Sequence, residues 1–395
     1  MRHALPAPHH LYIHVPFCRL VCAYCDFVTV GGRADDIPRY TDALRVELAA
    51  RPAPGELRTI YVGGGTPSLL SGDQVGMLIT MARDRWKRVA LEEITIEANP
   101  SAREVPDWDG FVAAGVTRIS LGVQSLRDAD LHALARGHTA AEAREAFAAA
   151  RTAGIGDISL DLIYGIPGQS LEDWRDGLDL AIELAPDHLS CYALQLVLSP
   201  DEWAAPPRPG AQRWRSRMAE RQDDGLASDQ YWLAEEVLRT AGFAHYELSS
   251  WARPGRESRH NSAYWSRRAY TGIGAGAHSY DGAADRSWNV RELDRYLEAA
   301  GSGVRPIDGR EELDAETRAF EAVALGLRRV DGISRSAFRE EFGADPVERY
   351  AMAVLETTGE GLLELDGDVM RLTPTGRLMA SEVLVAFVPE PARRR

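Results

Sequence analysis

The chain has 395 residues, of which 45% are hydrophobic and 26% are charged, so it can bury a large core and is not a disordered chain. Its 59 acidic and 45 basic residues give a net charge of −14, which excludes an overall basic surface of the kind that binds nucleic acid. It has only four cysteines and no signal-like or membrane-spanning apolar run, so we expect a cytoplasmic protein with at most peripheral membrane contact.

Short apolar runs alternate with helical stretches over the first half of the chain. The predicted strands include nearly continuous apolar runs, as expected of parallel strands buried on both faces, and they span Leu11–Val15, Thr59–Val62, Glu93–Ala98, Arg118–Leu121, Asp157–Ile163 and His188–Leu194. Helical spacing, stop signals and capping signals predict helices at Ile37–Ala50, Ser71–Trp86, Ala140–Ala153 and after Ser170. Six strand–helix units predict parallel strands with right-handed crossovers, and hence an α/β fold built on an incomplete (β/α)6 TIM-like barrel.

The second half of the chain is less regular. We expect a proline-rich loop at 199–210, one long helix at 213–241 and a covering loop rich in glycine and aromatic residues at 245–280. From about residue 312 the pattern changes to helical runs at 314–329, 334–342 and 346–358, a hairpin turning at Asp366-Gly367 and a helix from Pro374. That order is typical of a winged-helix unit, which we interpret as a small packing or interaction domain, with DNA binding as the alternative. The expected domains are a barrel at 1–200, a covering segment at 201–311 and a winged-helix-like domain at 312–395.

Three of the cysteines are closely spaced after the first predicted strand. Cys18, Cys22 and Cys25 have the pattern C-x3-C-x2-C, and three thiolates leave one iron of a 4Fe-4S cubane without a protein ligand. That open iron could bind an exogenous chelate. A zinc site with His14 as the fourth ligand, a redox thiol pair and buried structural cysteines remain alternatives at this point.

Other unusual residues also follow predicted strands, where parallel barrels collect their functional groups. GGGTP (63–67) follows the second strand, and glycines there allow a ligand to approach the backbone closely. Glu97 ends the third strand, where an unpaired buried charge would be costly. Gln124 follows the fourth strand and Asp161 lies late in the fifth, although each alone is more often a structural hydrogen-bonding group.

These motifs together resemble a known family. LYIHVPFCRLVCAYCDF (11–27) is similar to the opening of the oxygen-independent coproporphyrinogen oxidase group of radical S-adenosylmethionine (SAM) proteins. The likeness continues through GGGTPSLL (63–70), IEANP (96–100), RISLGVQSL (118–126), RGH (136–138), DLIYGIPGQ (161–169) and GIGAGAHSY (272–280). The resemblance implies a 4Fe-4S cluster on the three cysteines and SAM at its open iron. It further implies a SAM-binding set of Tyr12, Tyr24, Gly64, Gly65, Thr66, Glu97, Gln124, Arg136, Asp161, Ala193 and His278.

Two features separate the chain from the oxidase itself. Phe27 stands where the oxidase has a further cysteine, and only 17 residues precede Cys18, where the oxidase has a longer N-terminal extension. Instead, the run His260–Trp265 matches the HNxxYW motif of the HemW-like branch, the radical SAM heme chaperones. The resemblance to that branch implies heme as bound cargo, delivery to heme-accepting proteins such as respiratory enzymes, and His260 as a candidate heme ligand. Oxidative decarboxylation of coproporphyrinogen III to protoporphyrinogen IX is the alternative function, and whether SAM is cleaved stays open.

Overall fold

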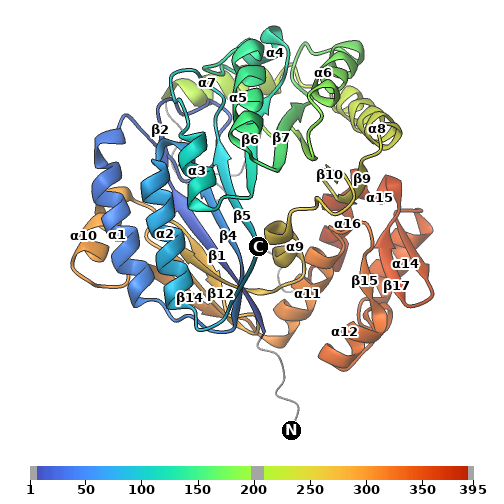
Figure 1. Cartoon of the computed structure of the whole chain (residues 1–395). Coiled ribbons are helices and arrows are strands. Elements are labelled where there is room, and N and C mark those ends of the chain that lie inside the picture. Colours follow the sequence, from blue (N-terminus) through green and yellow to red (C-terminus); the bar gives the residue numbers. More distant parts are fainter. Residues whose placement is uncertain (1–6, 197–208, 390–395) are drawn as a thin grey trace.

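A computed structural model describes residues 7–196 and 209–389 of the chain. Its central element there is a twelve-stranded sheet in the order β14-β13-β12-β11-β1-β4-β5-β6-β7-β8-β10-β9 (Figure 1). Six neighbouring strands at its centre run parallel, namely β1 (Pro8–Val15), β4 (Glu56–Gly64), β5 (Val89–Ala98), β6 (Arg118–Gln124), β7 (Asp157–Tyr164) and β8 (His188–Ala193). The six predicted strands and the α/β barrel class are therefore confirmed.

Helices cover the outer face of these parallel strands, as Figure 1 shows. They are α1 (Ile37–Ala50), α2 (Gly72–Arg85), α3 (Trp108–Ala114), α4 (Asp128–Ala133), α5 (Ala140–Ala153) and α6 (Leu171–Glu183). Capping boxes at Ser71, Thr139 and Ser170 begin α2, α5 and α6, because each side chain accepts a hydrogen bond from the third helical residue. Short elements connect the units, namely β2 (Phe17–Cys18), β3 (Val30–Gly31) and the 3-10 turns η1 (Ala34–Asp36) and η2 (Pro67–Leu69).

The two faces of the parallel strands differ in polarity. Residues such as Ile60, Ile96 and Ile119 are fully buried in the core that includes the helices. Alternate residues on the same strands, such as Glu97 and Ser120, line an internal cavity instead. A strand alternates its side chains between two faces, so one face supplies the core and the other supplies polar groups for a site.

The sheet extends beyond the six predicted strands at both edges. On one side β11 (Ala269–Ile273) pairs parallel with β1 and is followed by the antiparallel strands β12 (His278–Tyr280), β13 (Asp285–Asn289) and β14 (Ile307–Glu312). On the other side β10 (Ser250–Ala252) and β9 (Ala244–Glu247) add antiparallel strands next to β8. The expectation of a covering loop at 245–280 is wrong, because four of these strands and α9 (Arg259–Trp265) occupy most of that segment. Runs of three to seven residues are too short to show a period.

The long helix expected at 213–241 is also wrong. The chain forms α7 (Pro209–Ala219) and α8 (Asp224–Thr240), separated by a short turn. Asp223 begins the second helix, because its carboxylate accepts a hydrogen bond from the backbone N–H of Leu226 at 3.0 Å. Most of the loop expected at 199–210 lies outside the described residues.

The C-terminal segment forms a unit with its own apolar core, which includes Val323, Phe338, Met370 and Phe387. It follows α10 (Leu293–Gly301) and β14 and contains α11 (Ala315–Gly326), β15 (Ile333–Ser334), α12 (Arg335–Phe342), α13 (Pro346–Arg349), α14 (Ala351–Gly359), β16 (Leu363–Asp366), β17 (Val369–Leu372), α15 (Pro374–Leu378) and α16 (Ala380–Phe387). The hairpin turns at Gly367-Asp368, one residue later than expected. In Figure 1 this orange-red unit lies beside β9 and β10. No described helix is long and apolar enough to cross a membrane.

Candidate functional site

A cavity of about 650 Å³ occupies the polar interior of the barrel. The cysteine loop forms part of its wall, and the carboxyl ends of the parallel strands form another part. Residues of the C-terminal unit also reach it, among them Arg328 and Arg377. The cavity therefore joins three segments that lie far apart in the sequence.

The three cysteines of the loop are free, partly exposed and line this cavity. The loop is held in place by its own backbone, since the N–H of Cys25 donates to the carbonyl of Cys22 at 3.2 Å. It is also held from outside, because the guanidinium of Arg215 donates to the carbonyls of Ala23 and Cys25, each at 3.0 Å. Burial raises the pKa of Cys18 to about 12 and that of Cys25 to about 11, so these sulfurs need a cationic partner to become thiolates.

Two of these sulfurs each accept a hydrogen bond from a side chain. The Thr66 hydroxyl donates to Cys18 Sγ at 3.6 Å, and Arg136 Nη1 donates to Cys22 Sγ at 3.0 Å. N–H and O–H groups that point at sulfur are the protein's usual means of stabilising an iron–sulfur cluster. Three thiols on one cavity wall, with such donors beside them, are a set of ligands that could hold an iron–sulfur cluster.

The alternative zinc site does not fit the surroundings of His14. Its Nδ1 lies 2.9 Å from the hydroxyl of Tyr12 and its Nε2 lies 2.8 Å from the carbonyl of Val28, so both ring nitrogens are engaged. Within residues 7–196 and 209–389, no group of three or more His, Cys, Asp or Glu side chains is placed to hold one metal ion. A cubane does not need that arrangement, because each thiolate binds a different iron.

The glycines at the end of β4 have a steric reason to be glycine. Gly64 has φ +125°, and a Cβ there would lie 2.6 Å from Cε1 of His14. A Cβ on Gly65 would lie 2.7 Å from the carbonyl oxygen of Pro16. The bare backbone of this strand end therefore fits tightly against β1 and the cysteine loop and leaves Gly64, Gly65 and Thr66 on the cavity wall.

Glu97 lies at the end of β5 beside this glycine backbone. Its Oε1 accepts a hydrogen bond from the Tyr61 hydroxyl and its Oε2 accepts one from the N–H of Gly64, both at 2.8 Å. Burial raises the pKa of Glu97 to about 7 despite these hydrogen bonds. A carboxylate in this position would gain from a cationic ligand such as an amino group.

Further SAM candidates from the sequence also line the cavity. Gln124 holds a left-handed backbone with φ 67° where β6 ends. Asp161 accepts hydrogen bonds from Ser120 at 3.0 and 3.1 Å, and burial raises its pKa to about 6. The other members found on this wall are Tyr24, Arg136 and Ala193.

Two members of that set lie elsewhere. Tyr12 is behind the wall, with its ring stacked on Tyr61 at 6.1 Å between centroids and its hydroxyl on His14. His278 is exposed on β12 and stacks on Trp288 at 5.8 Å. Neither is among the residues that line the cavity.

His260 is fully buried, with 0% of its surface exposed. Its Nδ1 lies 2.7 Å from Thr59 Oγ1, and its Nε2 lies 2.8 Å from the hydroxyl of Tyr264, the tyrosine of the same motif. Thr59 Oγ1 also lies 2.8 Å from Nδ1 of His10, so the group continues into β1. No lone pair of His260 is directed at the cavity, which a heme ligand would require. Its neighbour Asn261 does line the cavity.

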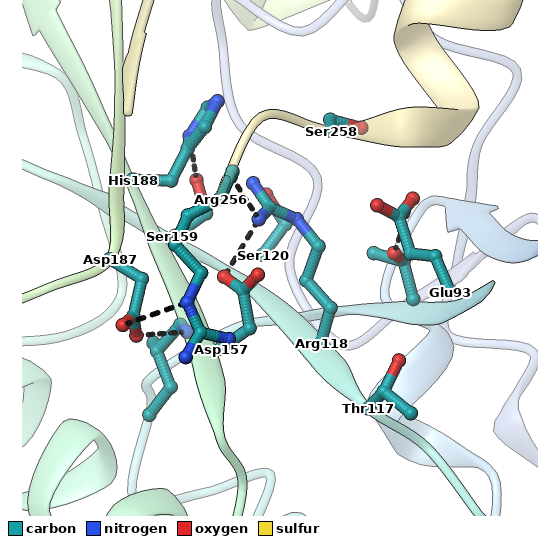
Figure 2. Close-up of polar contacts among 12 residues, drawn as sticks. Glu93, Thr117, Arg118, Ser120, Asp157, Ser159, Asp187, His188, Arg256 and Ser258 are labelled. Carbon is teal, nitrogen blue, oxygen red and sulfur yellow. Dashed lines mark hydrogen bonds and ion pairs between the residues drawn. The ribbon is translucent and has the colours of Figure 1, made fainter. Parts of the chain in front are cut away.

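A polar layer of the barrel interior was not singled out from the sequence. Figure 2 shows Arg118 donating to Asp157 at 2.7 Å and to the carbonyl of Arg256 at 3.1 Å, and His188 next to Ser159 at 2.8 Å. Arg118, Ser159 and His188 all line the cavity. The signal was present as alternation, because polar residues occupy alternate positions in the first part of β6, β7 and β8.

Known proteins with a similar sequence or fold indicate the class to which this protein belongs. A radical SAM superfamily model matches residues 12–181, and a HemN C-terminal domain model matches residues 313–379. The solved structure of the Escherichia coli coproporphyrinogen III oxidase HemN, described as a radical SAM enzyme, superposes with a TM-score of 0.82 over 97% of this chain and 90% of that one, at 23% identity. The fold and the cysteine loop are those of a radical SAM protein, a class that implies a 4Fe-4S cluster and SAM.

Curated relatives narrow this class to one family. The heme chaperone HemW of Mycobacterium tuberculosis (strain H37Rv) is 39% identical over 95% of this chain and 94% of that protein. HemW of Escherichia coli is 34% identical over 97% of this chain and 99% of that protein, and HemW of Bacillus subtilis is 32% identical over 96% and 99%. The chain belongs to the HemW family.

Proposed function

We propose that this chain is a heme chaperone that binds a 4Fe-4S cluster, SAM and heme, and delivers the heme to acceptor proteins such as respiratory enzymes. The observation that carries the proposal is the position of the HNxxYW motif, whose Asn261 lies on the same cavity as the three cysteines. The full-length likeness to proteins named as heme chaperones supports it. Heme is the cargo in this proposal, and the cluster and SAM are resident cofactors.

One set of residues would bind the cluster, and a second set would bind SAM. Cys18, Cys22 and Cys25 would hold the cluster, which supplies an iron open to the amino and carboxylate groups of SAM. The carboxylate of Glu97 would bind the SAM amino group from the glycine strand end. The remaining candidates for the SAM pocket are Tyr24, Gly64, Gly65, Thr66, Gln124, Arg136, Asp161 and Ala193, all of which line the cavity.

Three of the predicted site residues do not line the cavity and would have other roles, namely Tyr12, His278 and His260. Tyr12 would support the wall through Tyr61, and the exposed position of His278 argues against a SAM contact. His260 would act as a positioning residue that anchors α9, because both its ring nitrogens are already hydrogen-bonded. The motif would then reach heme through residues on the cavity, of which Asn261 is one.

Coproporphyrinogen oxidation is the second candidate, favoured by the fold shared with HemN. Phe27 counts against it, because this side chain is 64% exposed at the cavity wall in the position of the oxidase's further cysteine. The cytoplasmic location expected from the sequence stays a prediction that cell fractionation would test.

An anaerobic hemin titration of the reconstituted chain tests the proposal. With iron and sulfide content verified, the Soret band should saturate at one heme per chain. The same preparation with SAM, a reductant and coproporphyrinogen III should form no protoporphyrinogen IX. Absence of saturable hemin binding would contradict the chaperone, and product formation would establish the second candidate instead.

A further inference from the structure

Two arginines of the C-terminal unit reach into the cavity and are weakly held there. Arg328 follows α11 and Arg377 lies in α15, and their side chains are 30% and 10% exposed. The buried Nε of each guanidinium has no hydrogen-bond partner among the described residues. The two residues still bring two positive charges to the cavity wall, where an anionic ligand could pair with them.

Each guanidinium forms a long ion pair with one glutamate. Arg328 lies 3.7 Å from Glu247 and Arg377 lies 3.8 Å from Glu235, both longer than a hydrogen bond. Each glutamate also accepts a hydrogen bond from another donor, through the oxygen that does not face the arginine. Glu247 accepts from the hydroxyl of Ser249 at 3.0 Å, and Glu235 accepts from the indole N–H of Trp251 at 3.0 Å.

A third polar group lies beside Arg377 on the same cavity. The buried residue Tyr231, on α8, lines the cavity, and its hydroxyl lies beside Arg377, which opposes the rise that burial gives the pKa of Tyr231. Two guanidinium groups and a hydroxyl are the donors that proteins use for carboxylates, and arginine can bind a carboxylate through two parallel hydrogen bonds.

The HNxxYW motif is connected to this group of donors. The guanidinium of Arg328 lies 4.3 Å from the ring centre of Trp265, the last residue of the motif. A cation over an indole face is attracted to it, so Trp265 fixes the orientation of Arg328 toward the cavity. The backbone supports the same contact, because the N–H of Leu248 donates to the carbonyl of Arg328 at 3.0 Å.

We propose that Arg328, Arg377 and Tyr231 form a carboxylate subsite that takes the two propionate groups of heme at the end of the cavity contributed by the C-terminal unit. This inference rests on the proposed function, in which heme is the cargo. It gives the C-terminal unit a part in ligand binding, and it gives the tryptophan of the motif a role that does not involve iron.

The test compares hemin with hemin dimethyl ester, whose propionates carry no charge, on the reconstituted full chain. The wild type should bind hemin at least about tenfold more tightly than the ester, since hydrogen bonds to charged groups are worth about that much. Arg328→Ala and Arg377→Ala should each lower hemin affinity about tenfold and leave ester affinity nearly unchanged. Arg371→Ala is the matched control, because Arg371 is a surface residue of the same unit that pairs with Glu364.

The outcomes separate the subsite from the proposed function. Equal binding of hemin and its ester by the wild type would overturn the subsite and would leave heme binding intact. The same conclusion would follow if the variants bound hemin as the wild type does, provided that circular dichroism and the SAM-induced change in the cluster EPR signal show them to be folded. No saturable hemin binding by the wild type would overturn the proposed function and the subsite together. The ester comparison needs no variant, so misfolding of a variant cannot obscure the result.

Discussion

Replacing His260 with alanine should destabilise the fold rather than remove a heme ligand. The change deletes two buried hydrogen bonds, to Thr59 and Tyr264, and leaves a cavity where a fully buried ring had been. Each hydrogen bond contributes about 1 kcal/mol net, and loss of a buried ring adds a cavity term, so we expect the free energy of unfolding to fall by about 3–5 kcal/mol.

The pH dependence of this loss gives the prediction a distinctive sign. Burial lowers the pKa of His260 well below its ordinary value of 6.5, so the folded chain holds this ring neutral. The unfolded chain takes up a proton below about pH 6.5, so the stability associated with neutral His260 is present above that pH and is lost as the pH falls. The difference in stability between wild type and His260→Ala should therefore shrink from pH 7.5 to pH 5.5.

Urea unfolding followed by circular dichroism at the two pH values measures the effect, with His278→Ala as the control because His278 is exposed. Hemin titration under conditions where His260→Ala remains folded completes the test, and it should show the same axial-ligand spectrum as the wild type. An unchanged unfolding free energy together with loss of that spectrum would contradict this prediction and make His260 a direct heme ligand.

Three further predictions concern the cofactor end of the cavity. Burial raises the pKa of Glu97 from 4.5 to about 7, so the free energy of unfolding should fall as the pH rises through this range. In urea unfolding, Glu97→Gln should therefore lose less stability than the wild type between pH 5 and pH 8. An equal loss in the two proteins would contradict the raised pKa of Glu97. Arg136→Ala removes a positive charge and a hydrogen-bond donor to Cys22, so the reduction potential of the cluster should fall by roughly tens of millivolts in an EPR-monitored redox titration. An unchanged or higher potential would argue against the contact between Arg136 and Cys22. Cys191→Ala should keep full iron and sulfide content, because this buried residue belongs to β8 and not to the C-x3-C-x2-C loop, whereas Cys22→Ala should lose it. The reverse pattern would move the cluster.

The fold of the first half could be predicted from the sequence because its strands and helices carry strong local signals. The capping boxes at Ser71 and Ser170 and the apolar strand runs each determine an element without help from distant residues. The edge strands within 245–280 could not be predicted, because β10 and β12 have three residues each and exist only through pairing with neighbours distant in sequence.

Some residues of the candidate site could also be predicted from the sequence, and others could not. Residues at strand ends, such as Glu97 and Gln124, could be expected on the cavity because parallel strands bring their carboxyl ends together. The burial of His260 could not, since its partner Thr59 is 201 positions away in the sequence. Arg328 and Arg377 carried no signal either, because their place on the cavity depends on how the C-terminal unit meets the barrel.

A heme chaperone must pass its heme to an acceptor protein, and this transfer can be measured. The reconstituted chain, loaded with one equivalent of hemin, would be mixed with the apo form of a heme-requiring respiratory enzyme, and the recovered activity of that enzyme would be followed with time. We expect the activity to return faster and to a higher level than with the same amount of free hemin, and a chain that lacks all three cluster cysteines should be impaired in this transfer. Transfer no better than from free hemin would contradict the proposal that this chain is a heme chaperone.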